Sequence, residues 1–280
     1  MKIAVLSGKG GTGKTTVSAS LAYALENSQY IDCDVEEPNG AIFLKPVSLK
    51  TCEVNVPVPE VDATCCTGCG ACAKVCQFHA LAVIKGNVLV FAEICHHCGA
   101  CRIACPAGAI HETSRTIGVV ETSADGAFIH GRLNIGEPVG IPIIRELKKR
   151  MSDKRFIILD CPPGASCAVM KSVEGCDFGI LVTEPTPFGL HDLQIAAGLM
   201  EKVGIPYGVI INKATPEEKI IQPFCTENGI EVLLEMPFSQ EIAANYSNGI
   251  LPVQADPDWK ARFRDVARKC VMQVEEEAKR

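Results

Sequence analysis

MKIAVLSGKGGTGKTT, residues 1–16, opens the chain and decides its fold. Lys2–Leu6 is a short apolar run that stops near a glycine, which predicts a buried strand. Residues 8–15 then match G-x-x-x-x-G-K-[ST], and helical character continues through Glu26. In this order, glycine backbone N–H groups can turn toward phosphate oxygens, and the positive end of the helix reinforces them. We therefore expect a nucleotide site between the strand and the helix.

The residue types of this loop have distinct expected roles. Lys14 would reach the β- and γ-phosphates, and the Thr15 hydroxyl would ligate Mg²⁺. A glycine-rich turn that matches by chance is the alternative, which the flanking strand and helix disfavour. The candidate nucleotide-binding residues of the loop are Gly8, Gly10, Gly11, Thr12, Gly13, Lys14, Thr15 and Thr16.

Two further stretches place carboxylates after predicted strands. Tyr30–Asp34 is a second short strand pattern that ends in Asp-x-Asp, and turn residues follow it. Phe156–Asp160 is an apolar strand pattern that ends in an acid and runs into Cys-Pro-Pro-Gly, which is typical of a Walker B strand. The alternative for Asp160 is a cap on a helix that begins near Ala165.

A second lysine, Lys9, follows the first glycine of the loop. Together with Asp34 and the D-x-P-P-G stretch at Asp160, it resembles the deviant Walker A ATPases of the MinD/ParA/Mrp/nitrogenase iron-protein class. The resemblance implies that Lys9 reaches the partner's nucleotide across a dimer interface, that Asp34 orients the attacking water, and that Asp160 holds Mg²⁺ through a water. A solvated loop lysine is the alternative for Lys9.

The same resemblance implies that the chain binds and hydrolyses ATP, and that a dimer closes around two ATP molecules. Ile211-Asn212-Lys213 resembles the adenine-contacting element of this class, and the Asn212 amide can offer a donor and an acceptor to a base edge. Met236-Pro237-Phe238 is expected beside the base. The partner in the dimer is a second copy or a paralogue.

Nine cysteines crowd into residues 65–105. Eight of them form two runs of C-x-x-C-x-x-C-x-x-x-C, and the second run repeats the first at an offset of 29 residues. Sixteen cysteines in 280 residues would be unusual where disulfides do not persist, so metal binding explains them better. The runs are Cys66, Cys69, Cys72 and Cys76, then Cys95, Cys98, Cys101 and Cys105.

Each run matches the bacterial ferredoxin spacing, in which three close cysteines bind one [4Fe–4S] cluster and the fourth serves the other cluster. Zinc held by CxxC pairs is the alternative. Gln77 replaces the proline that usually follows the fourth cysteine, and Cys65 breaks the spacing, so we expect it not to bind a cluster. The ferredoxin pattern assigns Cys66, Cys69, Cys72 and Cys105 to cluster 1, and Cys95, Cys98, Cys101 and Cys76 to cluster 2.

The alternation of strand and helix patterns predicts an α/β fold with a mostly parallel sheet. The resemblance implies that this fold is a P-loop NTPase of the deviant Walker A, SIMIBI type. Residues 1–54 and 115–280 would form it, and residues 55–114 would be an inserted α+β domain like bacterial ferredoxin. Pro57 and Pro59 are expected to bound a linker. Further expected elements are a hairpin of Leu81–Ile84 and Val88–Phe91, strands at Ile117–Val120, Phe128–His130, Gly179–Thr183 and Tyr207–Ile211, and helices at Pro142–Arg150, Leu190–Val203 and Trp259–Val274.

Composition excludes several classes. A net charge of −6 and a pI near 5.6 argue against nucleic acid as a partner. The sequence has no apolar run of 18 residues, so no membrane span is predicted. The N-terminal residues show no secretory pattern, so a cytoplasmic location is expected. The last helix ends in acidic residues that anionic lipid would repel, so we expect it to pack on the core.

Three function classes remain open. The first is ATP-gated electron transfer through two [4Fe–4S] clusters to a redox acceptor protein. The second is a carrier or maturation ATPase that delivers iron–sulfur or other metal cofactors to an acceptor. The third is a positioning ATPase like MinD. Cys161, Cys167 and Cys176 near the Walker B strand are expected to be buried and inert, with a bridging cluster at Cys161 or Cys167 as the alternative.

Overall fold

The computed structural model describes residues 1–152, 156–217 and 219–279. In this part of the chain, nine strands form one sheet in the order β11-β10-β9-β1-β8-β2-β7-β6-β3. The strands from β11 to β7 run parallel, whereas β6 and β3 are antiparallel to their neighbours. The strands are β1 (Lys2–Leu6), β2 (Ser28–Asp32), β3 (Lys50–Val61), β6 (Ile110–Thr122), β7 (Phe128–Leu133), β8 (Phe156–Asp160), β9 (Phe178–Thr183), β10 (Tyr207–Ala214) and β11 (Val232–Pro237).

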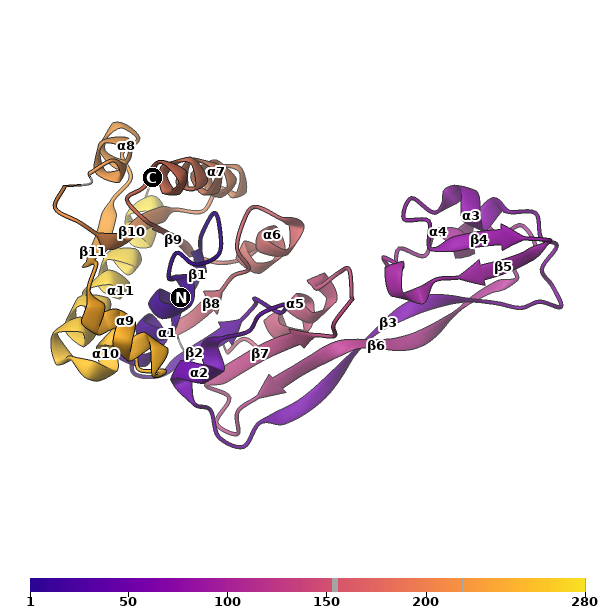
Figure 1. Cartoon of the computed structure of the whole chain (residues 1–280), viewed down its shortest axis with the longest axis horizontal. Helices are drawn as coiled ribbons and strands as arrows, with labels where there is room; N and C mark the ends of the chain where they lie inside the picture. The colour runs from indigo at the N-terminus through magenta and orange to yellow at the C-terminus, as the bar shows by residue number, and fades with distance from the viewer. Residues whose placement is uncertain (153–155, 218, 280) are drawn as a thin grey trace.

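Helices cover both faces of this sheet (Figure 1), as an open parallel sheet requires. One buried apolar layer includes Ile143, Leu147 and Met200, and the other includes Leu21, Phe43 and Phe263. The helices of the sheet domain are α1 (Lys14–Ala24), α2 (Gly40–Leu44), α5 (Ile141–Lys148), α6 (Cys167–Val173), α7 (Pro187–Val203), α8 (Ile221–Glu227), α9 (Gln240–Ser247), α10 (Pro252–Ala255) and α11 (Pro257–Glu277).

The last helix packs on the core, as predicted. Along α11 the apolar side chains recur at helical spacing, and Trp259, Phe263, Val266 and Cys270 are buried. Within the described residues, no helix has the length and apolar character that crossing a membrane requires.

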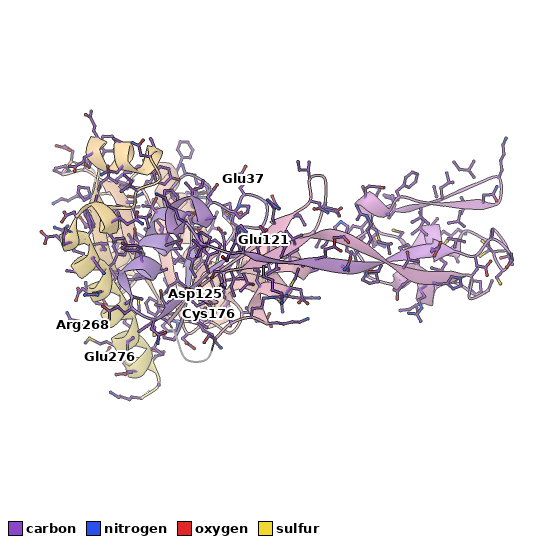
Figure 2. All side chains as sticks on the ribbon, turned by 90° about the horizontal axis from the view of Figure 1, so that it is seen from below. Glu37, Glu121, Asp125, Cys176, Arg268 and Glu276 are labelled. Atoms are coloured by element: carbon purple, nitrogen blue, oxygen red, sulfur yellow. The ribbon has the colours of Figure 1, made fainter. Side chains whose placement is uncertain are left out.

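Strands β3 and β6 form a long antiparallel arm at one edge of the sheet. Their pairing runs from Lys50 opposite Thr122 to Val61 opposite Ile110. Beyond its end, residues 62–109 form what we call the distal module, which two perpendicular views place away from the helices of the sheet domain (Figures 1 and 2). The module contains α3 (Ala71–Val75), the hairpin β4 (Leu81–Ile84) and β5 (Asn87–Val90), the 3₁₀ turn η1 (Ala92–Ile94) and α4 (Ala100–Ile103).

The expectation that Pro57 and Pro59 bound a linker is wrong. Both lie inside the twelve-residue strand β3, opposite Ser114 and Glu112. Proline lacks a backbone N–H, but β3 is the edge strand of the sheet, where one side of the strand needs no partner. The expected domain boundaries at residues 54/55 and 114/115 therefore fall within two continuous strands.

Several elements match their predicted bounds, namely β1, β8 and the first strand of the hairpin. Others shift. Strand β2 covers Ser28–Asp32 and ends two residues before Asp34, because Asp34 donates its backbone N–H to the Asp32 carboxylate instead of the sheet. Helix α6 begins at Cys167 with Ser166 at its N-cap, so Asp160 does not cap it.

Candidate functional site

The loop of residues 8–13 connects β1 to α1 at the carboxyl end of the parallel strands. Gly11 and Gly13 have φ of +84° and +90°, a region that favours glycine. A Cβ on Gly13 would also lie 2.2 Å from Nδ2 of Asn212. The glycines thus allow a backbone path that the side chains of other residues would obstruct.

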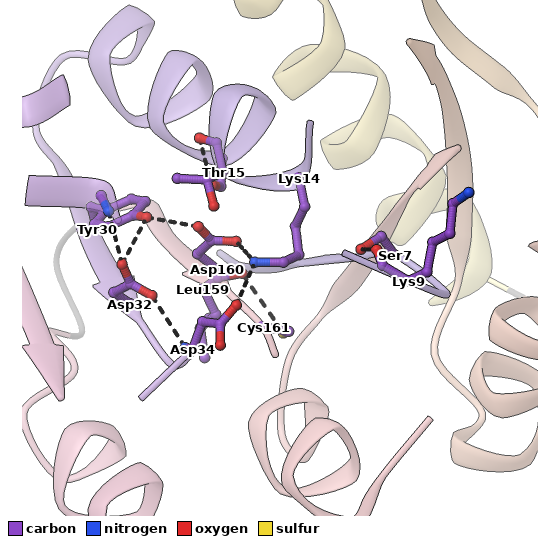
Figure 3. A network of polar contacts seen from close by, with 12 residues as sticks. Ser7, Lys9, Lys14, Thr15, Tyr30, Asp32, Asp34, Leu159, Asp160 and Cys161 are labelled. Carbon is purple, nitrogen blue, oxygen red and sulfur yellow. Dashed lines mark hydrogen bonds and ion pairs between the residues drawn. The ribbon is translucent and has the colours of Figure 1, made fainter. Parts of the chain in front are cut away.

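Three buried or half-buried charged side chains meet below this loop (Figure 3). Lys14 Nζ lies 2.5 Å from Oδ1 of Asp160 and 3.5 Å from Oδ2 of Asp34. The Tyr30 hydroxyl donates a hydrogen bond of 2.8 Å to Oδ2 of Asp160. The structure therefore brings together the lysine and the two acids that the sequence singled out.

The charged side chains in this cluster shift one another's pKa values. Burial raises the pKa of the Asp34 carboxyl to about 6, an effect that the Lys14 ammonium opposes and the Asp160 carboxylate reinforces. Burial acts to lower the pKa of Lys14, but the charges of Asp160 and Asp34 outweigh it, so this pKa is raised. Lys14 is therefore a cation at neutral pH.

Asp32 shapes the loop that carries Asp34. Its Oδ1 accepts the backbone N–H of Asp34 at 3.1 Å, and its Oδ2 accepts that of Gly40 at 3.0 Å. Burial, followed by the charge of Asp160, raises the pKa of Asp32. Asp32 thus holds both ends of the segment between β2 and α2.

A cleft that is partly open to solvent extends from the loop past the carboxyl ends of β10 and β11 to α9. Asn212 lines it, but its Nδ2 also donates to the carbonyl oxygen of Thr12 at 2.8 Å. Lys9 is exposed and points away from the acid cluster (Figure 3). The other predicted residues that line the cleft are Gly10, Gly11, Gly13, Lys14, Thr15, Thr16 and Asp34, together with Met236, Pro237 and Phe238.

The distal module contains two smaller cavities, each lined by four cysteines. Both are partly open to solvent. Each set combines three cysteines of one run with the last cysteine of the other run. The first cavity is lined by Cys66, Cys69, Cys72 and Cys105, and the second by Cys76, Cys95, Cys98 and Cys101.

The backbone around the cavities repeats with the sequence. Ala80 N–H donates to the sulfur of Cys76 at 3.3 Å, and 29 residues later Ala109 N–H donates to that of Cys105 at the same distance. The same backbone contact thus recurs at the fourth cysteine of each run. Within residues 1–152, 156–217 and 219–279, no three Cys, His, Asp or Glu side chains are arranged around a single metal ion.

The remaining predicted cysteines differ in exposure. Cys161 and Cys176 are buried, as expected, and burial raises the pKa of both thiols. Cys167 is exposed at the start of α6, so the expectation that it is buried is wrong. Its helix position explains this, because the first turn of α6 packs Val169 inward instead. Cys65 is exposed and lines neither cavity.

Tyr30 is a site residue that the sequence reasoning did not single out for its hydroxyl. It lies in β2, two strands from β1, and its ring stacks on Phe128 at a centroid distance of 5.5 Å. No local pattern marks a tyrosine whose partner lies 130 residues further along the chain.

Known proteins resemble this chain in sequence and in fold. The family model of the CobQ/CobB/MinD/ParA nucleotide binding domain matches residues 3–253. An uncharacterized protein of Methanocaldococcus jannaschii is 31% identical over 276 residues, which cover 96% of either chain. An iron–sulfur cluster carrier protein of Pyrococcus abyssi is 22% identical over 308 residues, covering 98% of this chain and 87% of the relative.

Among solved structures, the septum site-determining protein MinD of Pyrococcus horikoshii, complexed with Mg-ADP, superposes with a TM-score of 0.57 at 20% identity. The match covers 96% of this chain and 94% of that one. This likeness supports the mostly parallel α/β fold. The chain belongs to the CobQ/CobB/MinD/ParA family of nucleotide-binding proteins.

Proposed function

We propose that this protein binds and hydrolyses Mg-ATP and uses the nucleotide cycle to gate electron transfer through two [4Fe–4S] clusters in the distal module. One observation carries the proposal. A chain with a complete phosphate loop also holds two cavities whose cysteines divide three plus one, as the ferredoxin spacing requires.

The grouping of the cysteines favours a polynuclear cluster over zinc. Each cavity joins three closely spaced cysteines of one run to the last cysteine of the other run, which is the division of the ferredoxin pattern, whereas zinc is held by CxxC pairs. The eight cysteines would hold two clusters, and each cluster when bound supplies one-electron transfer.

At the nucleotide site, the backbone N–H groups of residues 10–15 would surround the phosphates. Lys14 would leave Asp34 and neutralise charge on the β- and γ-phosphates, since the two acids and the nucleotide compete for one ammonium. Thr15 and Asp160 would hold Mg²⁺, and Asp34 would then be free to orient water.

Lys9 would act in a dimer, formed with a second copy or with a paralogue. Its exposed side chain points away from the acid cluster of its own subunit (Figure 3), as a group that serves the partner's nucleotide would. The acceptor of the electrons would be a separate redox protein.

Iron and sulfide analysis of anaerobically purified protein tests the clusters. We expect close to eight irons and eight sulfides per chain from two clusters of four. Cys66→Ser should lose iron, whereas Cys65→Ser, which changes the neighbouring thiol outside both cavities, should not. Stoichiometric zinc in place of iron would refute the proposal.

The second candidate function is an iron–sulfur carrier, which the resemblance to the Pyrococcus abyssi carrier protein favours. The two functions differ in how tightly the clusters are held. After incubation with excess apo-ferredoxin, an electron-transfer protein should retain its iron, and a carrier should pass iron to the acceptor with a dependence on ATP. A redox titration with Mg-ATP, Mg-ADP and no nucleotide then tests gating directly.

A further inference from the structure

A partly buried ion pair at the base of the arm lies between the sheet domain and the distal module, which Arg115 contacts at Ala92. The guanidinium of Arg115, in β6, contacts the carboxylate of Glu137 through two bonds, Nη2 to Oε1 at 2.5 Å and Nη1 to Oε2 at 2.9 Å. The Glu137 side chain is only 5% exposed, and that of Arg115 is 24% exposed. A bidentate pair of this kind fixes orientation as well as distance.

On one side, Arg115 reaches the turn that begins the second cysteine run. Its Nη1 also donates to the carbonyl oxygen of Ala92 at 3.3 Å, and the same oxygen accepts the backbone N–H of Cys95 at 3.3 Å. Cys95 lines the second cavity. The position of the guanidinium is therefore coupled to the position of this cysteine.

On the other side, Glu137 belongs to a loop that packs against the residue after Asp34. Leu133 N–H donates to the Val35 carbonyl at 2.8 Å. Val35 is buried between two glycines, since a Cβ on Gly131 or Gly140 would lie 2.8 or 2.6 Å from its methyl groups. Val35, next to Asp34, therefore contacts both ends of the segment from residue 133 to 140, which carries Glu137.

We propose that the Arg115–Glu137 pair transmits the state of the nucleotide loop to the turn around Cys95, so that ATP acts first on the second cysteine-lined cavity. The inference rests on the proposed function for the source of movement, which is the exchange of Lys14 from Asp34 to phosphate. Arg115 and Glu137 are positioning residues, because neither contacts the cleft or lines a cysteine cavity.

Hydrogen–deuterium exchange of the full-length, anaerobically purified protein tests this without depending on iron. We expect amides of residues 92–98 to exchange at rates that differ by about fivefold between Mg-ADP and a non-hydrolysable Mg-ATP analogue, the low end of typical coupling between sites. In Arg115→Gln this difference should fall below about twofold, while nucleotide protection of residues 8–16 persists.

Two further variants keep the test independent of folding defects. Arg102→Gln removes the module's arginine from a more exposed pair with Glu112 of β6, at 2.9 Å and with Arg102 61% exposed, and should keep the full difference in exchange rate. The reversed pair, Arg115→Glu with Glu137→Arg, should restore part of it. The inference would be overturned if Arg115→Gln kept the full difference in the exchange rates of residues 92–98 between the two nucleotides. It would also be overturned if the wild type showed no such difference while the nucleotide protected residues 8–16.

The same experiment separates the proposed function from the proposed transmission through Arg115 and Glu137. Loss of nucleotide protection at residues 8–16 in the wild type would refute the ATP-binding function, and the inference with it. Missing iron with an intact nucleotide effect on residues 92–98 would refute the clusters but support the transmission path.

Discussion

The hydroxyl of Tyr30 donates a hydrogen bond to Oδ2 of Asp160, and both side chains are buried. This bond leaves Oδ1 of Asp160 to Lys14. The carboxylate that is expected to hold Mg²⁺ is therefore oriented by two donors, one from β2 and one from α1.

Tyr30→Phe should lower the free energy of unfolding by about 2 kcal/mol, because a buried carboxylate loses a donor. Urea denaturation measures this. Tyr207→Phe is the matched control, since its hydroxyl contacts Glu201 at the surface at 3.3 Å, and it should change stability by less than about 0.5 kcal/mol. Equal losses in the two variants would contradict the role of the buried bond.

Lys14→Ala should abolish ATP hydrolysis, because the phosphates lose their charged partner and two acids lose theirs.

Lys9→Ala should bind ATP almost normally but fail to form an ATP-dependent dimer, since its side chain points away from its own site. Calorimetry measures ATP binding by Lys9→Ala, and light scattering measures its dimer formation. Normal turnover by Lys9→Ala would refute its role in the partner's site.

The rate of ATP hydrolysis should fall as the pH drops through about 6, the raised pKa of Asp34. Above this pH the carboxyl is ionised and can accept a hydrogen bond from the attacking water; below it, the proton blocks that role. The acid limb of kcat/KM reports the free enzyme. Asp34→Asn should be slow at all pH values and lack this limb, and a persistent limb would assign it to another group.

Gly13→Ala should weaken ATP binding far more than Gly11→Ala. Both glycines have positive φ, which costs an L-residue about 1–2 kcal/mol. A Cβ on Gly13 would also displace the Asn212 amide and break its bond to Thr12, whereas nothing lies within 4 Å of a Cβ on Gly11. Isothermal titration with ATP compares the two, and similar affinities would show that the Asn212 contact is unimportant.

The sequence predicted those features whose information is local. The loop after β1 and the run into Asp160 are contiguous patterns, and the structure has β1 and β8 at the expected bounds. The grouping of cysteines around the two cavities also follows a local spacing, repeated once. The occupants of those cavities stay a prediction.

Other features depend on contacts between distant residues. Pro57 and Pro59 indicate a break in most contexts, and only the place of β3 at the sheet edge makes them compatible with a strand. The bond from Tyr30 to Asp160 and the pair of Arg115 with Glu137 join segments that the sequence reasoning treated separately. Neither pair has a pattern that periodicity can detect.

The two-stranded arm also acts as a lever. From residue 117, beside the sheet domain, to residue 110, at the distal module, seven residues of strand span about 23 Å at about 3.3 Å each. A tilt of about 5° at the base would therefore move the far end by about 2 Å over this length. Under the proposed function, a small adjustment beside the phosphate loop would in this way change how the cysteine-rich end meets an acceptor protein.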